Sequence, residues 1–177
     1  MELFETIAQR HSYRGPMQDK PVPREDLSKI VQAGIQAPSG YNAQTTEFVI
    51  VDDPSLLDEI AAIDPGNAVL REARAIIACT APAEPDPGTG QLFFGIEDCA
   101  AAVENMLLAI TAMGYASVWL DGWLRLRGRA AMVGGILDVP ADRTVRVLLP
   151  LGVPARREEQ HPKKPFDERA WFNRYGA

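Results

Sequence analysis

The feature that most limits how this chain can fold is a long apolar helix, which we predict from about Phe93 to Met113, ended by Gly114. Its apolar stripe consists of Ile96, Ala100, Val103, Leu107 and Ile110, with Cys99, Met106 and Met113 along its margins. Few polar residues remain to face solvent, and a helix that is apolar on most sides is normally buried. We therefore expect this helix in the centre of the fold or at a subunit interface.

Shorter helices and strands occupy the rest of the chain. Hydrophobic periodicity with Pro and Gly punctuation predicts helices over 2–10, from Pro23 to Pro38, over 55–62 and over 127–137, with a further turn reaching Glu72. Apolar and β-branched runs predict strands over 47–51, 75–80, 116–120 and 144–151. Because helices and strands mix without strict β-α-β alternation, we expect an α+β fold in which helices flank a mixed β-sheet.

Size and charge restrict the class of protein. The 177 residues fit a single domain spanning 1–177, and no internal repeat or linker divides it. The net charge of −6 argues against nonspecific nucleic-acid binding, which needs a basic surface. No apolar run reaches the roughly 18 residues of a membrane span. The N-terminus lacks the basic and apolar regions of a signal peptide, so we expect a cytoplasmic protein.

The metal-binding and redox-active residue types are few. Cys79 and Cys99 are the only cysteines, and both lie in apolar periodic segments, so we expect buried free thiols rather than a disulfide. His11 and His161 are the only histidines, and the chain has no CxxC or HExxH motif. We therefore expect no metal site.

A cationic segment follows the N-terminal helix. It reads Arg10-His11-Ser12-Tyr13-Arg14, and the Gly15-Pro16 that comes next disfavours a helical conformation before it. In an extended segment, Arg10, Ser12 and Arg14 share one face. Two guanidinium groups around a hydroxyl suit a phosphate group. The alternative, that both arginines are solvated surface charges, remains open at this point.

A second polar segment joins a helix to a strand. It reads Ala37-Pro38-Ser39-Gly40-Tyr41-Asn42-Ala43-Gln44, a turn with several side-chain hydrogen-bond donors. Further on, Gly88 and Gly90 resemble the start of a dinucleotide fingerprint. Phe93 stands where the third small residue belongs, and the loop is too long after its strand, so we reject that interpretation.

Catalytic side chains are scarce. The acidic pairs Asp52-Asp53, Glu97-Asp98 and Glu158-Glu159 are sequence neighbours that point in different directions, so we interpret them as solvated faces or helix caps. No nucleophile elbow or Walker motif is present. Such a chain is either a binding or structural module or an enzyme whose cofactor carries the chemistry. Composition and spacing do not choose between these two classes.

Four motifs in order resemble the flavin-dependent nitroreductase family. The segment 10–14 is similar to its Arg-x-Ser-x-Arg motif, and 37–44 to its Ala-Pro-Ser-x-x-Asn-x-Gln turn. The segment 98–119 resembles its long central helix and following strand. Residues 149–154, followed by Lys163-Lys164-Pro165, resemble its C-terminal strand and basic turn. The resemblance implies a three-layer fold and a homodimer with two flavin mononucleotides (FMN), each contacted by both subunits.

The resemblance also implies which residues contact the FMN. Arg10, His11, Ser12 and Arg14 would hold its phosphate, ribityl chain and pyrimidine edge, and Pro38, Ser39, Gly40, Asn42 and Gln44 would come from the other subunit. Leu120, Asp121 and Gly122 would form a loop against the flavin, with the Gly122 backbone near N5. Asn67 is a looser match to a polar contact of the family. Lys163 and Lys164, or alternatively Arg156, would meet the phosphate.

The implied activity is ping-pong hydride transfer through the flavin N5. NAD(P)H would give a hydride and leave, and an electron-poor acceptor such as a nitroaromatic or quinone would then take the same face, with protons supplied by water. Other members of the family act as flavin reductases, dehalogenating enzymes or ring-reducing enzymes. The alternative hypothesis is a non-catalytic flavin-binding protein. In such a protein, Trp119, Trp123 or Trp171-Phe172 would cover the flavin ring.

The last part of the chain changes in character. From 155 to 177 it is basic and aromatic, with few aliphatic residues. Aromatic side chains are usually anchored against another surface. We therefore expect this extension to pack on the partner subunit, with a frayed terminus as the alternative.

Overall fold

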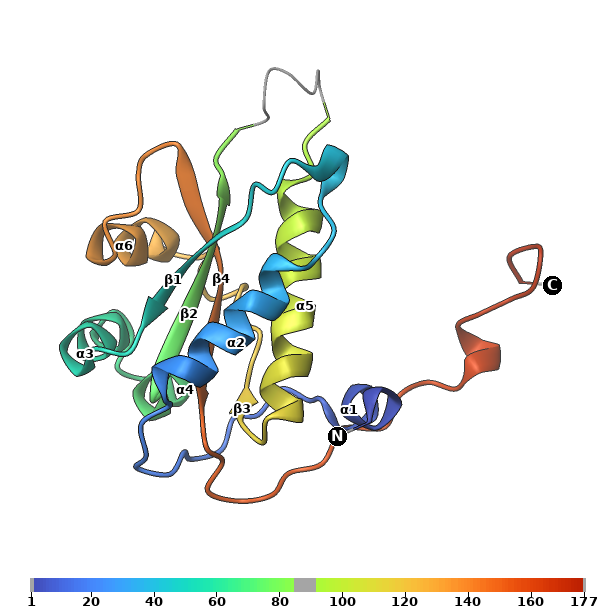
Figure 1. Cartoon of the computed structure of the whole chain (residues 1–177), viewed down its shortest axis with the longest axis horizontal. Helices are drawn as coiled ribbons and strands as arrows, with labels where there is room; N and C mark the ends of the chain where they lie inside the picture. Colours follow the sequence, from blue (N-terminus) through green and yellow to red (C-terminus); the bar gives the residue numbers. More distant parts are fainter. Residues whose placement is uncertain (1, 85–91, 177) are drawn as a thin grey trace.

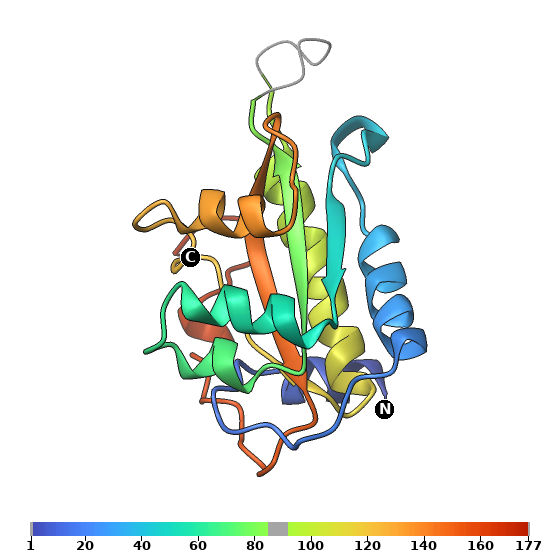
Figure 2. The ribbon, with the colours of Figure 1, turned by 90° about the vertical axis from the view of Figure 1, so that its left-hand side faces the viewer.

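The computed structural model describes residues 2–84 and 92–176, and in it helices cover both faces of a four-stranded β-sheet (Figures 1 and 2). In chain order the elements are α1 (Leu3–Gln9), α2 (Arg24–Ile35), the 3₁₀ turn η1 (Gly40–Asn42), β1 (Glu47–Val51), α3 (Pro54–Ala62), α4 (Ala68–Glu72), β2 (Ala75–Pro82), α5 (Gly95–Ala112), β3 (Ala116–Ser117), α6 (Arg129–Ile136), β4 (Arg143–Gly152) and the 3₁₀ turn η3 (Phe166–Glu168). The rejected dinucleotide fingerprint at 88–90 lies outside the described residues.

The strand order is β1-β2-β4-β3, and every pairing among the described strands is antiparallel. The expectation of a mixed sheet is therefore wrong. The register explains why: Val51 at the end of β1 lies opposite Ile76 near the start of β2. The helices α3 and α4 thus return the chain to the end of the sheet that it has just left, and the next strand must run back.

Two apolar cores lie on opposite faces of the sheet. Alternate residues of β2 point to opposite sides, so Ile77 and Cys79 join the core beneath α2 and α5, whereas Ile76 and Ala78 join the core beneath α3, α4 and α6. Figure 2 shows these two helical layers on either side of the strands. The α+β architecture with flanking helices is as predicted.

Helix α5 is the central element of the larger core. It buries the residues Gly95, Asp98, Cys99, Ala102, Val103, Met106, Leu107 and Ile110. Ile96, which we counted in the buried stripe, is 49% exposed. Cys79 and Cys99 are buried free thiols, as predicted.

Two predicted elements differ in the structure. The predicted strand 116–120 forms a ladder only over β3, after which Leu120 makes an isolated bridge to Leu148. Between them, Val118 is buried and Trp119 packs against the core. The apolar run at 118–119 thus reflects burial of these side chains and not strand pairing. The apolar face of α1 is exposed, since Phe4 is 77% exposed and Thr6 is the one buried residue of this helix.

The chain after β4 leaves the body of the protein. Beyond η3 no further helix or strand forms in the described residues, and Figure 1 shows the segment extending past α1 and away from the sheet. Phe166 and Phe172 pack against each other at a centroid distance of 6.0 Å and remain exposed. Among the described helices, none combines the length and the apolar character needed to cross a membrane.

Candidate functional site

The cationic segment 10–14 runs in an extended conformation beside β3. The Tyr13 N–H donates to the Ser117 carbonyl at 2.9 Å, and its hydroxyl donates to the Pro16 carbonyl at 2.7 Å. Tyr13 is 2% exposed, while Arg14 next to it is exposed. Burial of Tyr13 therefore fixes the segment and turns the Arg14 side chain outward.

The two arginines of this segment have different environments. Arg10 pairs with Glu104 of α5 at 3.4 Å and its side chain is 21% exposed. Arg14 is exposed, and among the residues that the structure describes its guanidinium contacts only the Ser12 carbonyl, at 3.5 Å. The interpretation as solvated surface charge thus fits Arg14 in a single protomer, but it does not fit Arg10.

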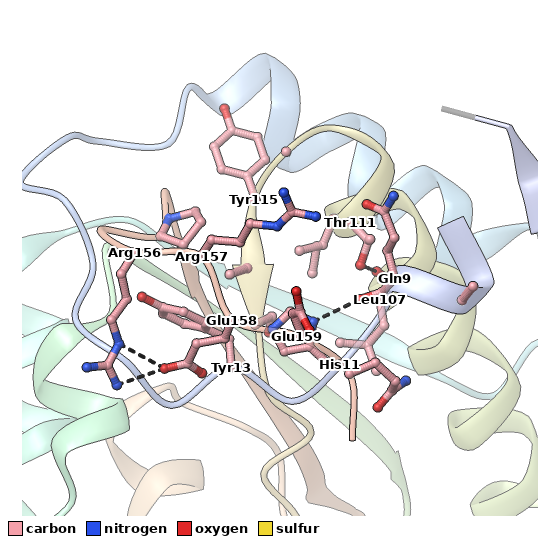
Figure 3. Close-up of a pocket in the computed structure, with 17 residues that line it drawn as sticks. Gln9, His11, Tyr13, Leu107, Thr111, Tyr115, Arg156, Arg157, Glu158 and Glu159 are labelled. Carbon is pink, nitrogen blue, oxygen red and sulfur yellow. Dashed lines mark hydrogen bonds and ion pairs between the residues drawn. The ribbon is translucent and has the colours of Figure 1, made fainter. Parts of the chain in front are cut away.

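His11 faces a pocket of about 330 Å³ between α1, the end of α5 and the start of the C-terminal extension (Figure 3). Its Nδ1 lies 2.8 Å from the Gln9 carbonyl oxygen, which indicates that Nδ1 carries the proton and leaves Nε2 as an acceptor. That Nε2 is buried and has no partner among the described residues. A buried ring nitrogen without a partner is rare in proteins and marks a place where a further group can bind.

The turn 38–44 lies beside the start of α5, where η1 is seen in Figure 1. Three non-glycine residues in it adopt positive φ, namely Tyr41 at 54°, Asn42 at 56° and Gln44 at 51°. The Ser39 hydroxyl accepts a hydrogen bond from the Gln44 N–H at 2.9 Å. Such conformations cost energy and occur preferentially at functional sites.

The structure does not bring these two segments together within one protomer. His11 and Tyr13 of the segment 10–14 line a pocket with Ile110, near the end of α5. The Gly40 N–H instead donates a hydrogen bond to Asp98 in the first turn of the same helix. Asp98 and Ile110 are twelve residues apart, which is about 18 Å along an α-helix. Within one chain the two segments therefore contact different parts of α5.

The loop after β3 is tied to the sheet on one side and open on the other. Leu120 exchanges backbone hydrogen bonds with Leu148, both at 3.0 Å, and the Asp121 carboxylate receives two hydrogen bonds from Arg125, at 2.5 and 2.8 Å. Gly122 is exposed, and a Cβ added there would meet nothing within 4 Å. Its N–H donates to no other residue in the described part of the chain. A ligand can thus approach this backbone closely.

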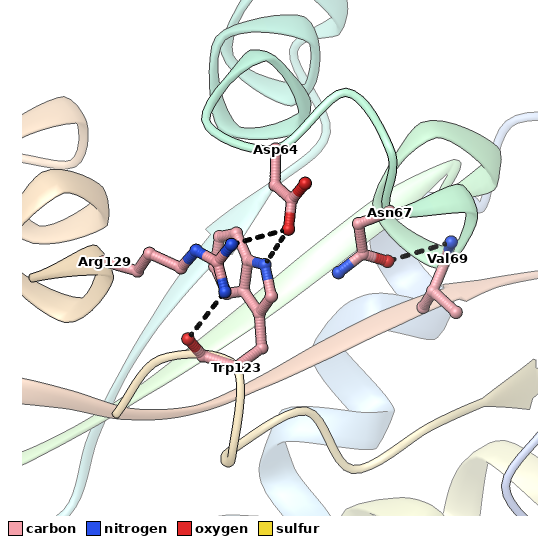
Figure 4. Close-up of polar contacts among 5 residues, drawn as sticks. All are labelled: Asp64, Asn67, Val69, Trp123 and Arg129. Carbon is pink, nitrogen blue, oxygen red and sulfur yellow. Dashed lines mark hydrogen bonds and ion pairs between the residues drawn. The ribbon is translucent and has the colours of Figure 1, made fainter. Parts of the chain in front are cut away.

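Asn67 caps α4 next to that loop (Figure 4). Its side-chain oxygen accepts from the Val69 N–H at 3.1 Å, and its own N–H donates to the Asp64 carbonyl at 2.8 Å. The Asp64 carboxylate accepts from the Trp123 indole at 2.9 Å and from Arg129 at 2.7 Å. The hydrogen bond from Trp123, with the Arg129 charge in support, lowers the pKa of Asp64 below its usual value.

The sequence did not indicate Asp64 or Arg129 as parts of a site. Asp64 and Arg129 are separated by the whole of β2 and α5, and only the fold places them in contact. The interpretation of Asp98 as a solvated acid is wrong, since it is 7% exposed. Asp53 does cap a helix, as predicted, because its carboxylate accepts from the N–H of Ser55 at 2.8 Å.

The basic residues of the C-terminal extension fall into two groups. Arg156 lines the pocket of His11 and pairs with Glu158 at 2.8 Å (Figure 3). Lys163 and Lys164 are exposed, and Lys164 pairs with Glu168 at 3.4 Å. Within one protomer, Arg156 and the neighbouring Arg157 therefore line the pocket with His11, whereas the two lysines are not among its lining residues.

The aromatic residues that a closed, non-catalytic site would use have other packing partners. Trp119 packs against the core beneath α5, and Trp123 packs against the opposite core with Arg129 stacked 4.8 Å from its ring centroid. Trp171 packs against Tyr175 within the extension in a tilted arrangement, with ring centroids 4.2 Å apart. No cluster of three or more potential metal ligands occurs in residues 2–84 and 92–176.

Comparison with known proteins places this geometry in context. The model of the Nitroreductase family matches residues 7–65 and 63–153. A protein of Methanothermobacter thermautotrophicus assigned as an NADH dehydrogenase/NAD(P)H nitroreductase is 31% identical over 157 residues, which cover 88% of this chain and 78% of the relative.

Two similar solved structures contain ligands. The NADPH:FMN oxidoreductase of Vibrio harveyi complexed with NAD+ has a TM-score of 0.81 and 26% identity, covering 99% of this chain and 78% of that chain. A protein of Desulfovibrio desulfuricans assigned as a nitroreductase, in complex with FMN, has a TM-score of 0.77 and 29% identity, covering 95% of this chain and 94% of that chain.

Proposed function

The chain belongs to the nitroreductase family of NAD(P)H oxidoreductases, and from this premise we propose that it is an FMN-dependent enzyme that passes a hydride from NAD(P)H to an electron-poor acceptor such as a nitroaromatic or a quinone. The relatives crystallised with FMN and with NAD+ support the choice of cofactor and of reductant. The arrangement of residues around the proposed site comes from this chain alone.

The observation that carries the proposal is the separation of two half-sites along α5. The cationic segment 10–14 lies near the end of this helix, and the strained turn 38–44 lies at its start. A two-fold axis crossing the middle of α5 would place the turn of one chain beside the cationic segment of its partner. Homodimers with such isologous interfaces are the commonest oligomers. We therefore propose a homodimer with two composite FMN sites.

The exposed apolar surface supports this assembly. In the single chain, Leu3, Phe4 and Ile7 form an exposed apolar face on α1, and Ile96 of α5 is half exposed. The aromatic residues of the extension 155–177 are also exposed, and this segment leaves the body of its own chain (Figure 1). Packing of the extension on the partner would bury both sets and would carry Lys163 and Lys164 to the other protomer.

The residues present fit an FMN. The Arg14 guanidinium is exposed, and within residues 2–84 and 92–176 its one hydrogen bond is the long contact with Ser12, so it is available to an anionic or carbonyl-rich edge. The buried Nε2 of His11 lacks a partner, which a hydroxyl donor would supply. The open backbone at Gly122 admits a flat ring at close distance. Ser12, Asn67 and the turn 38–44 would complete the polar contacts.

The role of this chain in the reaction is to bind, orient and polarise. A bound FMN would supply the chemistry of hydride transfer between NAD(P)H and the acceptor. Arg10, Arg14 and the lysines of the extension would supply positive charge around the phosphate and the pyrimidine edge, which stabilises negative charge that develops during reduction. The Gly122 N–H, which has no partner in the described part of the chain, would offer a hydrogen bond to the reacting ring.

FMN binding is tested by purifying the protein, removing any bound cofactor and titrating the apoprotein with FMN while following flavin fluorescence. We expect uptake of one FMN per chain, with quenching of its emission. FAD and riboflavin serve as controls, because only FMN presents a terminal monophosphate to the cationic segment. Absence of FMN uptake by the folded apoprotein would contradict the proposed function.

A further inference from the structure

Asp98 occupies the first turn of α5 and reaches across to the turn 38–44. Its Oδ1 accepts a hydrogen bond from the Gly40 N–H at 2.8 Å, and its Oδ2 accepts one from the Thr45 hydroxyl at 3.3 Å. The residue is 7% exposed. Gly40 and Thr45 flank the left-handed residues of the turn, so this single carboxylate holds both of its ends.

The backbone of the turn requires such an anchor. Tyr41, Asn42 and Gln44 all have positive φ, a region that non-glycine residues rarely adopt. Strained conformations persist only where the surrounding structure over-determines them. The hydrogen bonds from Gly40 and Thr45 to Asp98 attach the turn to helix α5 and restrain its backbone in this conformation.

Phe94 provides a second restraint from the same helix terminus. A Cβ added to Gly40 would lie 2.4 Å from Cδ2 of the Phe94 ring, so this ring packs directly on the Gly40 backbone. The Tyr41 ring meets Phe94 edge-on at a centroid distance of 5.8 Å. The turn is therefore seated on the start of α5, with Phe94 beneath it and Asp98 bonded to its backbone.

The contrast with Glu97 separates this role from a general effect of an acid at a helix N-terminus. Both acids lie in the first turn of α5, where a negative charge is favourable. Glu97 is exposed, whereas Asp98 is buried against the turn. Burying a carboxylate costs free energy, and interaction with the helix dipole does not require burial. The burial of Asp98 is therefore explained by its hydrogen bonds to the turn.

We propose that Asp98 is a positioning residue that holds the turn 38–44 in the conformation with which it contacts the FMN of the partner subunit. This assignment rests on the proposed function and adds to it the group that sets the geometry of the second half-site. Asp98 itself would not touch the cofactor. Its loss in one chain would weaken the FMN site built around the cationic segment of the other.

The first experiment compares FMN titrations of four apoproteins: the unmodified chain, Asp98→Ala, Asp98→Asn and the matched control Glu97→Ala. Asp98→Ala removes both acceptors, and we expect at least about tenfold weaker binding. Asp98→Asn keeps an oxygen for the Gly40 N–H and offers an amide to the Thr45 hydroxyl, so we expect binding within about threefold of the unmodified chain. Glu97→Ala should leave binding unchanged.

Hydrogen exchange of the Gly40 amide reports on the anchor without FMN. We expect slow exchange in the unmodified apoprotein and in Asp98→Asn, and faster exchange in Asp98→Ala, with unfolding midpoints measured for each variant. If Asp98→Ala does not fold, Thr45→Val removes the Oδ2 contact alone, and we expect about threefold weaker FMN binding. Unchanged binding in Thr45→Val would then contradict the proposal.

A mixed dimer tests the action across subunits. One chain carries Arg14→Ala, the other Asp98→Ala, and two affinity tags isolate the heterodimer. If the turn acts in trans, one composite site combines the intact Arg14 with an intact turn, and one FMN binds per dimer with the affinity of the unmodified protein. Two equally weak sites would overturn the action of Asp98 across the interface.

The outcomes separate the two proposals. No FMN uptake by the unmodified apoprotein overturns the proposed function, and the role of Asp98 with it. Uptake by the unmodified protein together with equal uptake by Asp98→Ala overturns the role of Asp98 alone. Loss of binding in Asp98→Asn as severe as in Asp98→Ala would also overturn it, because the charge rather than the geometry of the turn would then matter.

Discussion

The indole Nε1–H of Trp123 donates a hydrogen bond to Oδ2 of Asp64 across 2.9 Å, and this contact joins two loops that both contribute to the proposed flavin site. Trp123 directly follows Gly122, and the Asp64 carbonyl accepts the N–H of Asn67. Arg129 adds an ion pair to the same carboxylate oxygen at 2.7 Å. Asp64 thus links the two loops, through its backbone carbonyl to Asn67 and through its carboxylate to Trp123, and Figure 4 shows the carboxylate contacts.

Asp64→Asn should make the protein less sensitive to acid. The pKa of Asp64 is lowered in the folded state, first by the Trp123 hydrogen bond, so the ionised form contributes stability above its ordinary pKa of 3.8 and loses it as the pH falls through the lower folded value. The stability difference between the two proteins should be largest near neutral pH and shrink below 3.8. Thermal unfolding midpoints from about pH 7 to pH 3 measure this. A difference that does not vary with pH would show that Asp64 is not held ionised by these contacts.

Arg14→Ala should weaken FMN binding about 10- to 100-fold, because a charge-assisted hydrogen bond is worth about 1.5–3 kcal/mol. Since Arg14 is exposed, the free energy of unfolding of the apoprotein should change by less than about 0.5 kcal/mol. Lys20→Ala is the control, as it removes a positive charge at another exposed position. FMN titration and denaturant unfolding give both quantities. Equal FMN affinities of Arg14→Ala and the unmodified protein would refute the role of Arg14.

Gly122→Ala should separate cofactor binding from stability. The added methyl group meets nothing within 4 Å, and φ of Gly122 lies outside the left-handed region, so the apoprotein should gain about 0.5 kcal/mol through its less flexible unfolded chain. We expect about tenfold weaker FMN binding, because the methyl group would occupy space needed by the cofactor. Gly135→Ala, another position with open space, is the control and should bind FMN normally. Normal FMN binding by Gly122→Ala would remove this loop from the site.

Phe4→Glu should dissociate the dimer and abolish FMN binding at micromolar protein concentration. Phe4 is 77% exposed in the single chain, and a buried carboxylate would strongly disfavour an interface formed there. Light scattering should give twice the chain mass of 19.4 kDa for the unmodified protein and the chain mass itself for the variant. Met132→Glu changes an equally apolar, exposed residue on the opposite helical layer and should remain dimeric. A monomeric unmodified protein would contradict the composite site.

Tyr115→Phe should remove a phenol whose pKa is raised in the folded protein. Burial, followed by the hydrogen bond to Asp26, raises the pKa of Tyr115 to about 12. The neutral phenol is thus favoured in the folded state, and its stabilising effect is complete below the ordinary value of 10.0 and lost as the pH rises through about 12. Ultraviolet titration follows the phenolate directly. We expect a cost of about 1 kcal/mol in the free energy of unfolding at neutral pH.

The sequence predicted those elements whose signals are local. The strand 47–51 was correct at both ends, because its β-branched run ends at Val51, two residues before the Asp53 that caps α3. The second strand continues to Pro82, past the predicted end at 80, because Pro82 pairs with Arg143 of a strand far along the chain. Hydrophobic periodicity reports where a residue is buried, but it does not report the partner strand.

Strand direction and side-chain partners were not predictable for the same reason. Whether a sheet is mixed or antiparallel depends on where each connection returns the chain, and here α3 and α4 return it to the end it left. Asp98 and Gly40 are 58 positions apart, so nothing near Asp98 in the sequence indicates the turn it holds. The family resemblance identified the segments 10–14 and 37–44 as candidate FMN contacts. Only the fold shows that they contact different parts of α5.

The measurement that tests the account most directly is the visible spectrum of the purified protein before and after anaerobic addition of NADH and, separately, NADPH. We predict a two-banded spectrum of bound flavin that is bleached by at least one of the two nucleotides and restored by a nitroaromatic or a quinone. A bound flavin whose spectrum persists with both nucleotides would contradict the proposed NAD(P)H oxidoreductase and would favour a protein that binds flavin without this activity.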